Sequence, residues 1–97
     1  MNSVAYGSSA IFDEITLPDA LRNEHRTKAG TWGLLRVFEG EVLLVFRDGD
    51  GPVRVTVDNP AMIPPEAPHH VEIIGPMRMQ VEFHRVPPLP LTGPLHG

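Results

Sequence analysis

The sequence predicts a single small all-β domain of the sandwich or barrel type. Eleven prolines and nine glycines divide the 97 residues into short segments, which disfavours long helices. About six runs rich in β-forming residues follow one another at spacings of roughly 8 to 12 residues, with turn residues between them, as in sandwiches and barrels. We expect one domain over residues 1–97, with a core at about 11–86 and a Pro-rich surface tail at 87–97.

Each expected element has its own local signal. Pro18 favours the start of a helical turn, and the pair Glu39-Gly40 between two β-rich runs predicts a tight hairpin. The expected elements are an entry strand at 11–17, a helical turn at 18–24, and strands at 34–38, 41–47, 53–57, 69–74 and 77–85.

Two of these strands show a clear alternation of side chains. Val53, Val55 and Val57 alternate with polar residues, so all three are expected to face inward. In the last strand one face is apolar and the other is polar. The apolar face holds Met77, Met79, Val81 and Phe83, and the polar face holds Arg78, Gln80, Glu82 and His84.

Composition excludes several classes of partner and site. The net charge of -4 and the dispersed basic residues argue against nucleic acid and against an anionic membrane surface. The absence of cysteine excludes disulfides and thiolate ligands, so any metal must be held by imidazole and carboxylate. The apolar runs are far shorter than the roughly 20 residues of a membrane span, and no leader pattern begins the sequence, so we predict a cytoplasmic protein. An exposed edge strand in so small a domain also predicts a homodimer.

The five histidines are the residues best suited to chemistry. His25 precedes the first long strand and His69 begins a later one, and a small antiparallel barrel would bring the two together. His70 must point away from its neighbour in a regular strand, which predicts a surface position. His84 shares the face of Glu82 and either lines the pocket or lies outside it, and His96, in the tail, is expected to be inert.

The order His25, Trp32, Gly40, Pro64, His69 resembles the two-part cupin pattern. More closely, LPDALRNEHRTKAGTWGLLRVFEGEV and IPPEAPHHVEIIGPMRMQVEF resemble a small cupin family, found alone and as the N-terminal domain of tellurite-resistance methyltransferases of the TehB type. The resemblance covers residues 17–85. It implies a cupin barrel (a double-stranded β-helix of the jelly-roll kind) with a metal pocket, and a link to tellurite or stress response.

The sequence departs from the cupin pattern at several positions. Thr27 stands where the second histidine of the first half is expected, and Trp32-Gly33 where an acidic ligand is expected. Glu66 replaces a glycine of the second half, and Pro68 replaces a tryptophan of the small family. The sequence carries no methyltransferase pattern, so methylation is not assigned to it.

The remaining residues predict a reduced site for a divalent ion, which could be zinc, iron, nickel or manganese. His25 and His69 are the two expected imidazole ligands. Glu82, on the polar face of the last strand, is the first candidate for a third ligand. Glu72 is the second, and only a bulge would turn it to the side of His69.

Three functions are compatible with these residues. The first is a metal-binding cupin that binds a small polar or anionic molecule without turnover, and the others are a small Fe(II) oxygenase and a metal-free interaction module. Whether the chain is an enzyme stays open, and no catalytic residue is assigned. Four further residues have two interpretations each: Lys28 and Arg36 bind an anion or are solvated, Thr27 orients a water or makes a turn, and Trp32 is a pocket wall or core.

Overall fold

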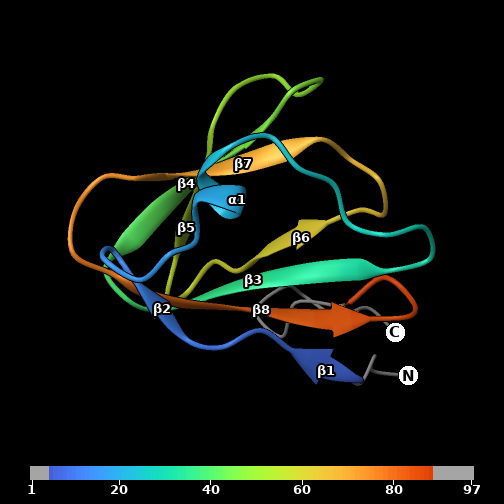
Figure 1. Ribbon diagram of the computed structural model, residues 1–97, viewed down its shortest axis with the longest axis horizontal. Coiled ribbons are helices and arrows are strands. Elements are labelled where there is room, and N and C mark those ends of the chain that lie inside the picture. The colour runs from blue at the N-terminus through green and yellow to red at the C-terminus, as the bar shows by residue number, and fades with distance from the viewer. Residues whose placement is uncertain (1–4, 89–97) are drawn as a thin grey trace.

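The computed structural model describes residues 5–88, which form eight short strands and one helical turn (Figure 1). The elements in chain order are β1 (Gly7–Ser8), β2 (Phe12–Asp13), α1 (Asp19–Arg22), β3 (Trp32–Glu39), β4 (Glu41–Phe46), β5 (Val53–Thr56), β6 (Ala61–Ile63), β7 (His69–Ile73) and β8 (Arg78–His84). The tail expected at 87–97 lies outside the described residues from position 89 onward.

The strands pair antiparallel in two sheets. The larger sheet has the order β1-β8-β3-β6, with β2 also paired to β8, and the smaller has the order β5-β4-β7. The all-β prediction is therefore confirmed. Within residues 5–88 no strand of one sheet pairs with a strand of the other, so the two sheets face each other as open layers and do not close into a barrel.

The prediction of a hairpin at Glu39-Gly40 is wrong. β3 ends at Glu39 in one sheet and β4 begins at Glu41 in the other, so the chain crosses between the layers here. Gly40 has a φ of +72°, and a Cβ at this position would lie 2.2 Å from the carbonyl oxygen of Pro76. Only glycine fits this close approach, and the glycine that suggested a hairpin instead serves a crossing between sheets.

The core lies between the two layers. The alternation predicted for the last strand is confirmed, because Met77, Met79 and Val81 are buried and Phe83 packs against the core. The alternation predicted at 53–57 holds only for Val55. Val53 is 38% exposed on an edge strand, and Val57 is 56% exposed because β5 has already ended at Thr56.

The N-terminal segment is less regular than predicted. The expected entry strand at 11–17 is reduced to β2, because the Asp13 carboxylate accepts hydrogen bonds from the backbone N–H groups of Ile15 and Thr16, both at 2.8 Å, and so makes a turn. These bonds also hold the pKa of Asp13 below its ordinary value. α1 begins directly after Pro18, as predicted. No helix within 5–88 is both long and apolar enough to cross a membrane.

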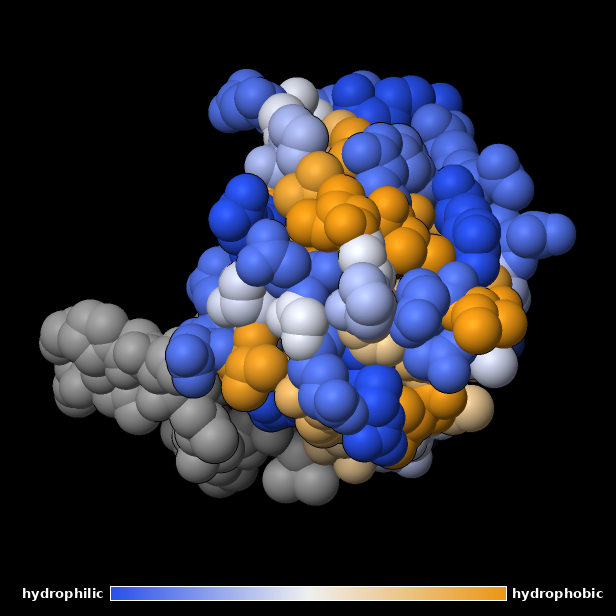
Figure 2. All heavy atoms as spheres, turned by 90° about the vertical axis from the view of Figure 1, so that its left-hand side faces the viewer, coloured by the Kyte–Doolittle hydropathy of each residue, from blue (hydrophilic) through white to orange (hydrophobic). Residues whose placement is uncertain are grey.

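Apolar side chains also lie on the surface at one end of the molecule. Figure 2 faces the end where the chain passes from β7 to β8, and it shows hydrophobic side chains gathered among hydrophilic ones. Ile15, Val57 and Ile74, each in a connection between elements, are at least half exposed. Such patches are typical of contact surfaces, and the homodimer stays a prediction.

Candidate functional site

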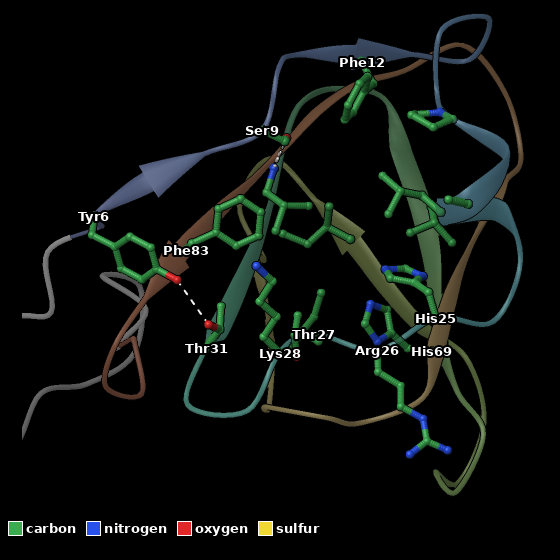
Figure 3. A pocket seen from close by; sticks show the side chains of 17 residues that line it. Tyr6, Ser9, Phe12, His25, Arg26, Thr27, Lys28, Thr31, His69 and Phe83 are labelled. Atoms are coloured by element: carbon green, nitrogen blue, oxygen red, sulfur yellow. Dashed lines mark hydrogen bonds between the residues drawn. The ribbon is translucent and has the colours of Figure 1, made fainter.

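A pocket of about 600 Å³ lies between the inner face of the larger sheet and β7 (Figure 3). α1 and the irregular segment 25–31 form the rest of its wall. Most of the lining is apolar and comes from six different elements, with side chains that include Phe12, Leu21, Leu35, Ile63, Val71 and Phe83. The volume and the apolar wall are typical of sites for small organic molecules.

Backbone hydrogen bonds hold the segment around residue 25 beside the start of β7. His25 and His69 exchange two bonds, each with N and O 2.9 Å apart. Two residues further on, the Thr27 hydroxyl donates to the carbonyl oxygen of Pro64 at 3.0 Å, and the Thr27 carbonyl accepts from the N–H of Glu66 at 3.1 Å. Two histidines far apart in sequence therefore meet, as expected.

The two imidazole rings lie against each other at one end of the pocket. Their centroids are 4.1 Å apart and their planes are tilted by 60°. Nδ1 of His69 lies 2.7 Å from the carbonyl oxygen of Ala67, and Nδ1 of His25 lies 3.3 Å from that of Asn23. Because a carbonyl oxygen only accepts, both Nδ1 atoms donate, so the Nε2 atom of a neutral ring has a lone pair to offer. Metal-bound histidines are oriented by the same kind of bond.

Burial lowers the pKa of His69, which is only 2% exposed. The bond to Ala67 opposes this shift, and the nearby imidazoles of His25 and His70 add to it. His69 is therefore neutral at neutral pH, and its Nε2 is an acceptor or a ligand.

Glu82 lies on the opposite face of the larger sheet from the pocket. Val81 and Phe83 line the pocket, so the residue between them points away from it. The Glu82 carboxylate accepts a 2.6 Å hydrogen bond from Nε of Arg36 and lies 3.3 Å from Nε2 of His84. The structure thus does not bring the first candidate for a third ligand to the imidazole pair.

Glu72 is also directed away from the imidazole pair. β7 pairs with β4 without a bulge, so residues 70 and 72 face outward while His69 faces inward. The Glu72 carboxylate lies 2.9 Å from Nε2 of His70. Over residues 5–88 no three His, Asp or Glu side chains are grouped closely enough to hold a metal ion. The metal site stays a prediction, and of its four candidate ligands only His25 and His69 lie close together.

The charge of the pocket is opposite in sign to that of the chain. Lys28 extends into the pocket with its ammonium directed toward Phe83, whereas the guanidinium of Arg26 points away from the pocket (Figure 3). Lys28 makes no ion pair with any residue in the described part of the chain. None of the described lining residues is acidic, although the chain as a whole carries -4.

Four other residues singled out in the sequence have positions that point to a role in the fold. Thr27 lines the pocket, but its hydroxyl completes the turn at Pro64. Trp32 is half-buried in β3, and neither it nor Arg36 lines the pocket. His84 is buried on the outer face beside Glu82. His96 lies outside the described residues.

The sequence did not reveal the part of the pocket that comes from the N-terminal segment. Tyr6 and Ser9 line it, and the Tyr6 hydroxyl lies 3.1 Å from Oγ1 of Thr31. The Arg85 guanidinium stacks on the Tyr6 ring, 4.5 Å from its centroid. β1 has only two residues, too few for an alternation to be seen. For Phe83 the sequence did indicate an inward-facing side chain, because the residue lies on the apolar face of the last strand. That pattern does not distinguish a pocket wall from core.

Comparisons with known proteins agree on one relationship. The model of the TehB-like domain family matches residues 8–81. The crystal structure of TehB from Haemophilus influenzae is similar with a TM-score of 0.74 and 25% identity, over 86% of this chain and 31% of that one. This chain therefore spans about a third of the length of TehB. A protein from E. coli strain K12 is similar in fold with a TM-score of 0.76 and 20% identity, over 86% of this chain and 90% of that one. No curated protein matches in sequence.

Proposed function

The chain belongs to the TehB-like domain family, and we propose that it is a binding domain that takes up a small anionic molecule in the pocket between its sheets, without turnover. The observation that carries this proposal is the charge of the lining. Lys28 points into the pocket without a counter-ion among residues 5–88, and no described carboxylate lines the wall. Lys28 is an exposed residue, and near a protein surface the effective dielectric constant is below that of bulk water, so a cation there attracts an anion more strongly than one in open water.

The family supports a more specific version of this function. We propose that the two facing sheets are an open form of the cupin fold, and that the domain is an accessory in tellurite or stress response. An oxyanion such as tellurite has the charge that Lys28 would attract. The chain spans about a third of TehB, so methyl transfer is not part of the proposal.

A titration with a simple anion tests the binding function. The protein, labelled with ¹⁵N and stripped of metal with EDTA, is titrated with sodium tellurite and with sodium acetate. We expect the amide signals of Lys28, Thr31 and Val71, all of which line the pocket, to shift in a saturable manner for at least one of the two anions. In Lys28→Met the affinity should fall at least tenfold.

The matched control is Arg54→Met in β5, which removes one positive charge from an exposed ion pair with Glu41. Its affinity should equal that of the unmodified protein within about twofold. Shifts spread over the whole surface, or an equal loss of affinity in both variants, would show general attraction of anions and contradict a specific site.

A divalent ion at the imidazole pair is the second candidate function. It is favoured by the hydrogen bonds of both Nδ1 atoms, which leave both Nε2 atoms available. His25 and His69 would hold the ion, which would supply Lewis acidity and open positions for a bound molecule. The fit is partial, because Glu82 and Glu72 are directed elsewhere.

Elemental analysis of protein purified without an affinity tag tests the metal site. We expect close to one zinc, iron, nickel or manganese ion per chain, lost in His25→Ala and retained in His70→Ala. His70 is the matched control because it is adjacent in sequence but faces the other side of β7. Less than about a tenth of an ion per chain would reject this site and the oxygenase that depends on it, and would leave the anion site to be judged alone.

A further inference from the structure

The size of the pocket does not match a small inorganic anion. Its volume is about 600 Å³, whereas an oxyanion occupies the space of a few water molecules, at about 30 Å³ each. Such an ion would leave most of the pocket to solvent. The volume lies well within the range of roughly 300–1,000 Å³ found for sites that bind organic molecules.

The wall of the pocket also does not match an ion that needs hydration. Phe12, Leu21 and Phe83 come from β2, α1 and β8 and present hydrocarbon to the same space. An inorganic ion gains nothing from these surfaces and loses water when it lies against them. A hydrocarbon group gains affinity there in proportion to the area that it buries.

The polar groups of the pocket are divided between two ends. At one end Lys28 and Thr31 are joined by a turn, in which the Thr31 N–H donates to the Lys28 carbonyl at 3.0 Å. The hydroxyls of Thr31 and Tyr6 are 3.1 Å apart. Only one of their two hydrogens is needed for that bond, so the other remains available to an anion. This end offers an ammonium group and a hydroxyl donor.

The imidazole end offers acceptors instead. The Nδ1 hydrogens of His25 and His69 are already donated to backbone carbonyl oxygens, so they are unavailable to an anion. Figure 3 shows the imidazole pair and the Lys28–Thr31 turn on different sides of the pocket, with Thr27 between them. The anion therefore belongs at the Lys28 end.

We propose that the ligand is a small organic acid with an apolar body. Its carboxylate pairs with Lys28 and accepts a hydrogen bond from the Tyr6–Thr31 hydroxyl pair, and its hydrocarbon part lies against Phe12, Leu21 and Phe83. This inference rests on the proposed binding of an anion and names the chemical class of that anion.

A homologous series of acids tests the inference. The full chain, free of metal, is titrated by NMR with acetate, butanoate, hexanoate and 3-phenylpropanoate, with hexanamide as the uncharged analogue and tellurite as the inorganic anion. From acetate to hexanoate the affinity should rise about fourfold for each added methylene, which corresponds to the roughly 0.8 kcal/mol gained per buried CH₂. Tellurite should bind no more tightly than acetate.

Two variants separate the ends of the ligand. Lys28→Met should lower the affinity for hexanoate at least tenfold and change the affinity for hexanamide by less than twofold, because only the ion pair is lost. Leu21→Ser, at a half-buried position on α1, should lower the affinity for hexanoate several-fold and leave the affinity for acetate unchanged. The thermal unfolding of each variant confirms that it is folded, and Arg54→Met serves again as the charge control.

The outcomes are distinguishable from one another. Equal affinities along the acid series, with a loss in Lys28→Met, would overturn the apolar body and leave the proposed anion binding intact. Hexanamide binding as tightly as hexanoate would overturn the carboxylate anchor. If no anion binds, tellurite included, both this inference and the proposed function would be overturned.

Discussion

The two faces of β8 differ in charge: the outer face carries ion-paired side chains, and the inner face is apolar. On the outer face, Glu82 is paired with Arg36 and His84. On the inner face, Val81 and Phe83 contribute only hydrocarbon to the pocket wall. The charged groups of this strand are thus paired on the outer face, Glu82 with Arg36 and Arg78 with Glu39, and the strand adds no ionisable group to the pocket.

The difference shows where polar function is carried in this small domain. Lys28, Thr31 and His25 belong to the irregular segment between α1 and β3, and His69 stands at the first position of β7. The larger sheet supplies a rigid apolar wall, and the connections supply the groups that recognise a ligand. This division is common where loops carry function on a stable scaffold.

Placing a charge on the inner face of β8 should strongly destabilise the fold. In Val81→Asp, a carboxylate replaces a side chain that is 9% exposed and faces apolar neighbours. We expect the free energy of unfolding to fall by about 3 kcal/mol, because a buried charge without a partner loses its hydration. Urea denaturation followed by far-UV circular dichroism measures this change.

The matched variant one residue further on, Glu82→Gln, removes a charge from the outer face. Its ion pair with Arg36 is partly exposed, with side-chain exposures of 22% and 34%, so the loss should be about 1 kcal/mol or less. Equal losses in the two variants would contradict the distinction between the faces.

The irregular segments contain strain that the strands do not. Glu66 has a φ of +61°, the only positive φ of a non-glycine residue in the described part of the chain. Glycine adopts a positive φ more readily than a residue with a side chain does. Glu66→Gly should raise the free energy of unfolding by about 0.5–1 kcal/mol. Glu66→Ala removes the same carboxylate without relieving the strain, so a gain in this control would show that charge is responsible.

The buried imidazole of His69 allows the inner, apolar side of the domain to be tested by pH. Burial lowers the pKa of His69 from its ordinary value of 6.5, so the unfolded chain takes up this proton before the folded one. The contribution of neutral His69 is therefore complete above pH 6.5 and is lost as the pH falls from there toward the pKa of the folded state. The nearby imidazoles of His25 and His70 add to the shift.

We expect the free energy of unfolding, measured with EDTA present, to fall as the pH is lowered below about 6.5, and to fall less steeply in His69→Gln. An unchanged slope in this variant would show that another group is responsible for the acid sensitivity.

Much of the fold was predictable because side-chain alternation reports burial directly. The long strands and the buried face of the last strand followed from it. The crossing at Gly40 was not predictable, because a turn glycine does not reveal whether the next strand pairs with the previous one. The carbonyl of Pro76, far away in sequence, makes glycine necessary there.

The candidate site was predictable in its two histidines and in Lys28, for which the sequence left anion binding or a solvated position open. The convergence of the histidines followed from the family resemblance, and the structure adds the backbone bonds that hold them together. Glu82 was expected at the site because it is polar on a suitable strand, but strand parity sends it to the outer face, where Arg36 binds it. The apolar lining looked like ordinary core, since a sequence pattern does not show where two layers leave a space.

The backbone bridge between His25 and His69 has a consequence for how the domain opens and closes. Only one residue on each side makes it, through two hydrogen bonds, so it should open more readily than the long ladder between β3 and β8. A molecule or ion that contacts both imidazoles would tie together segments that are far apart along the chain, and would restrain a large loop. Occupancy should then appear as slower exchange of these two amide hydrogens with solvent, which makes them internal reporters of any ligand held at that end of the pocket.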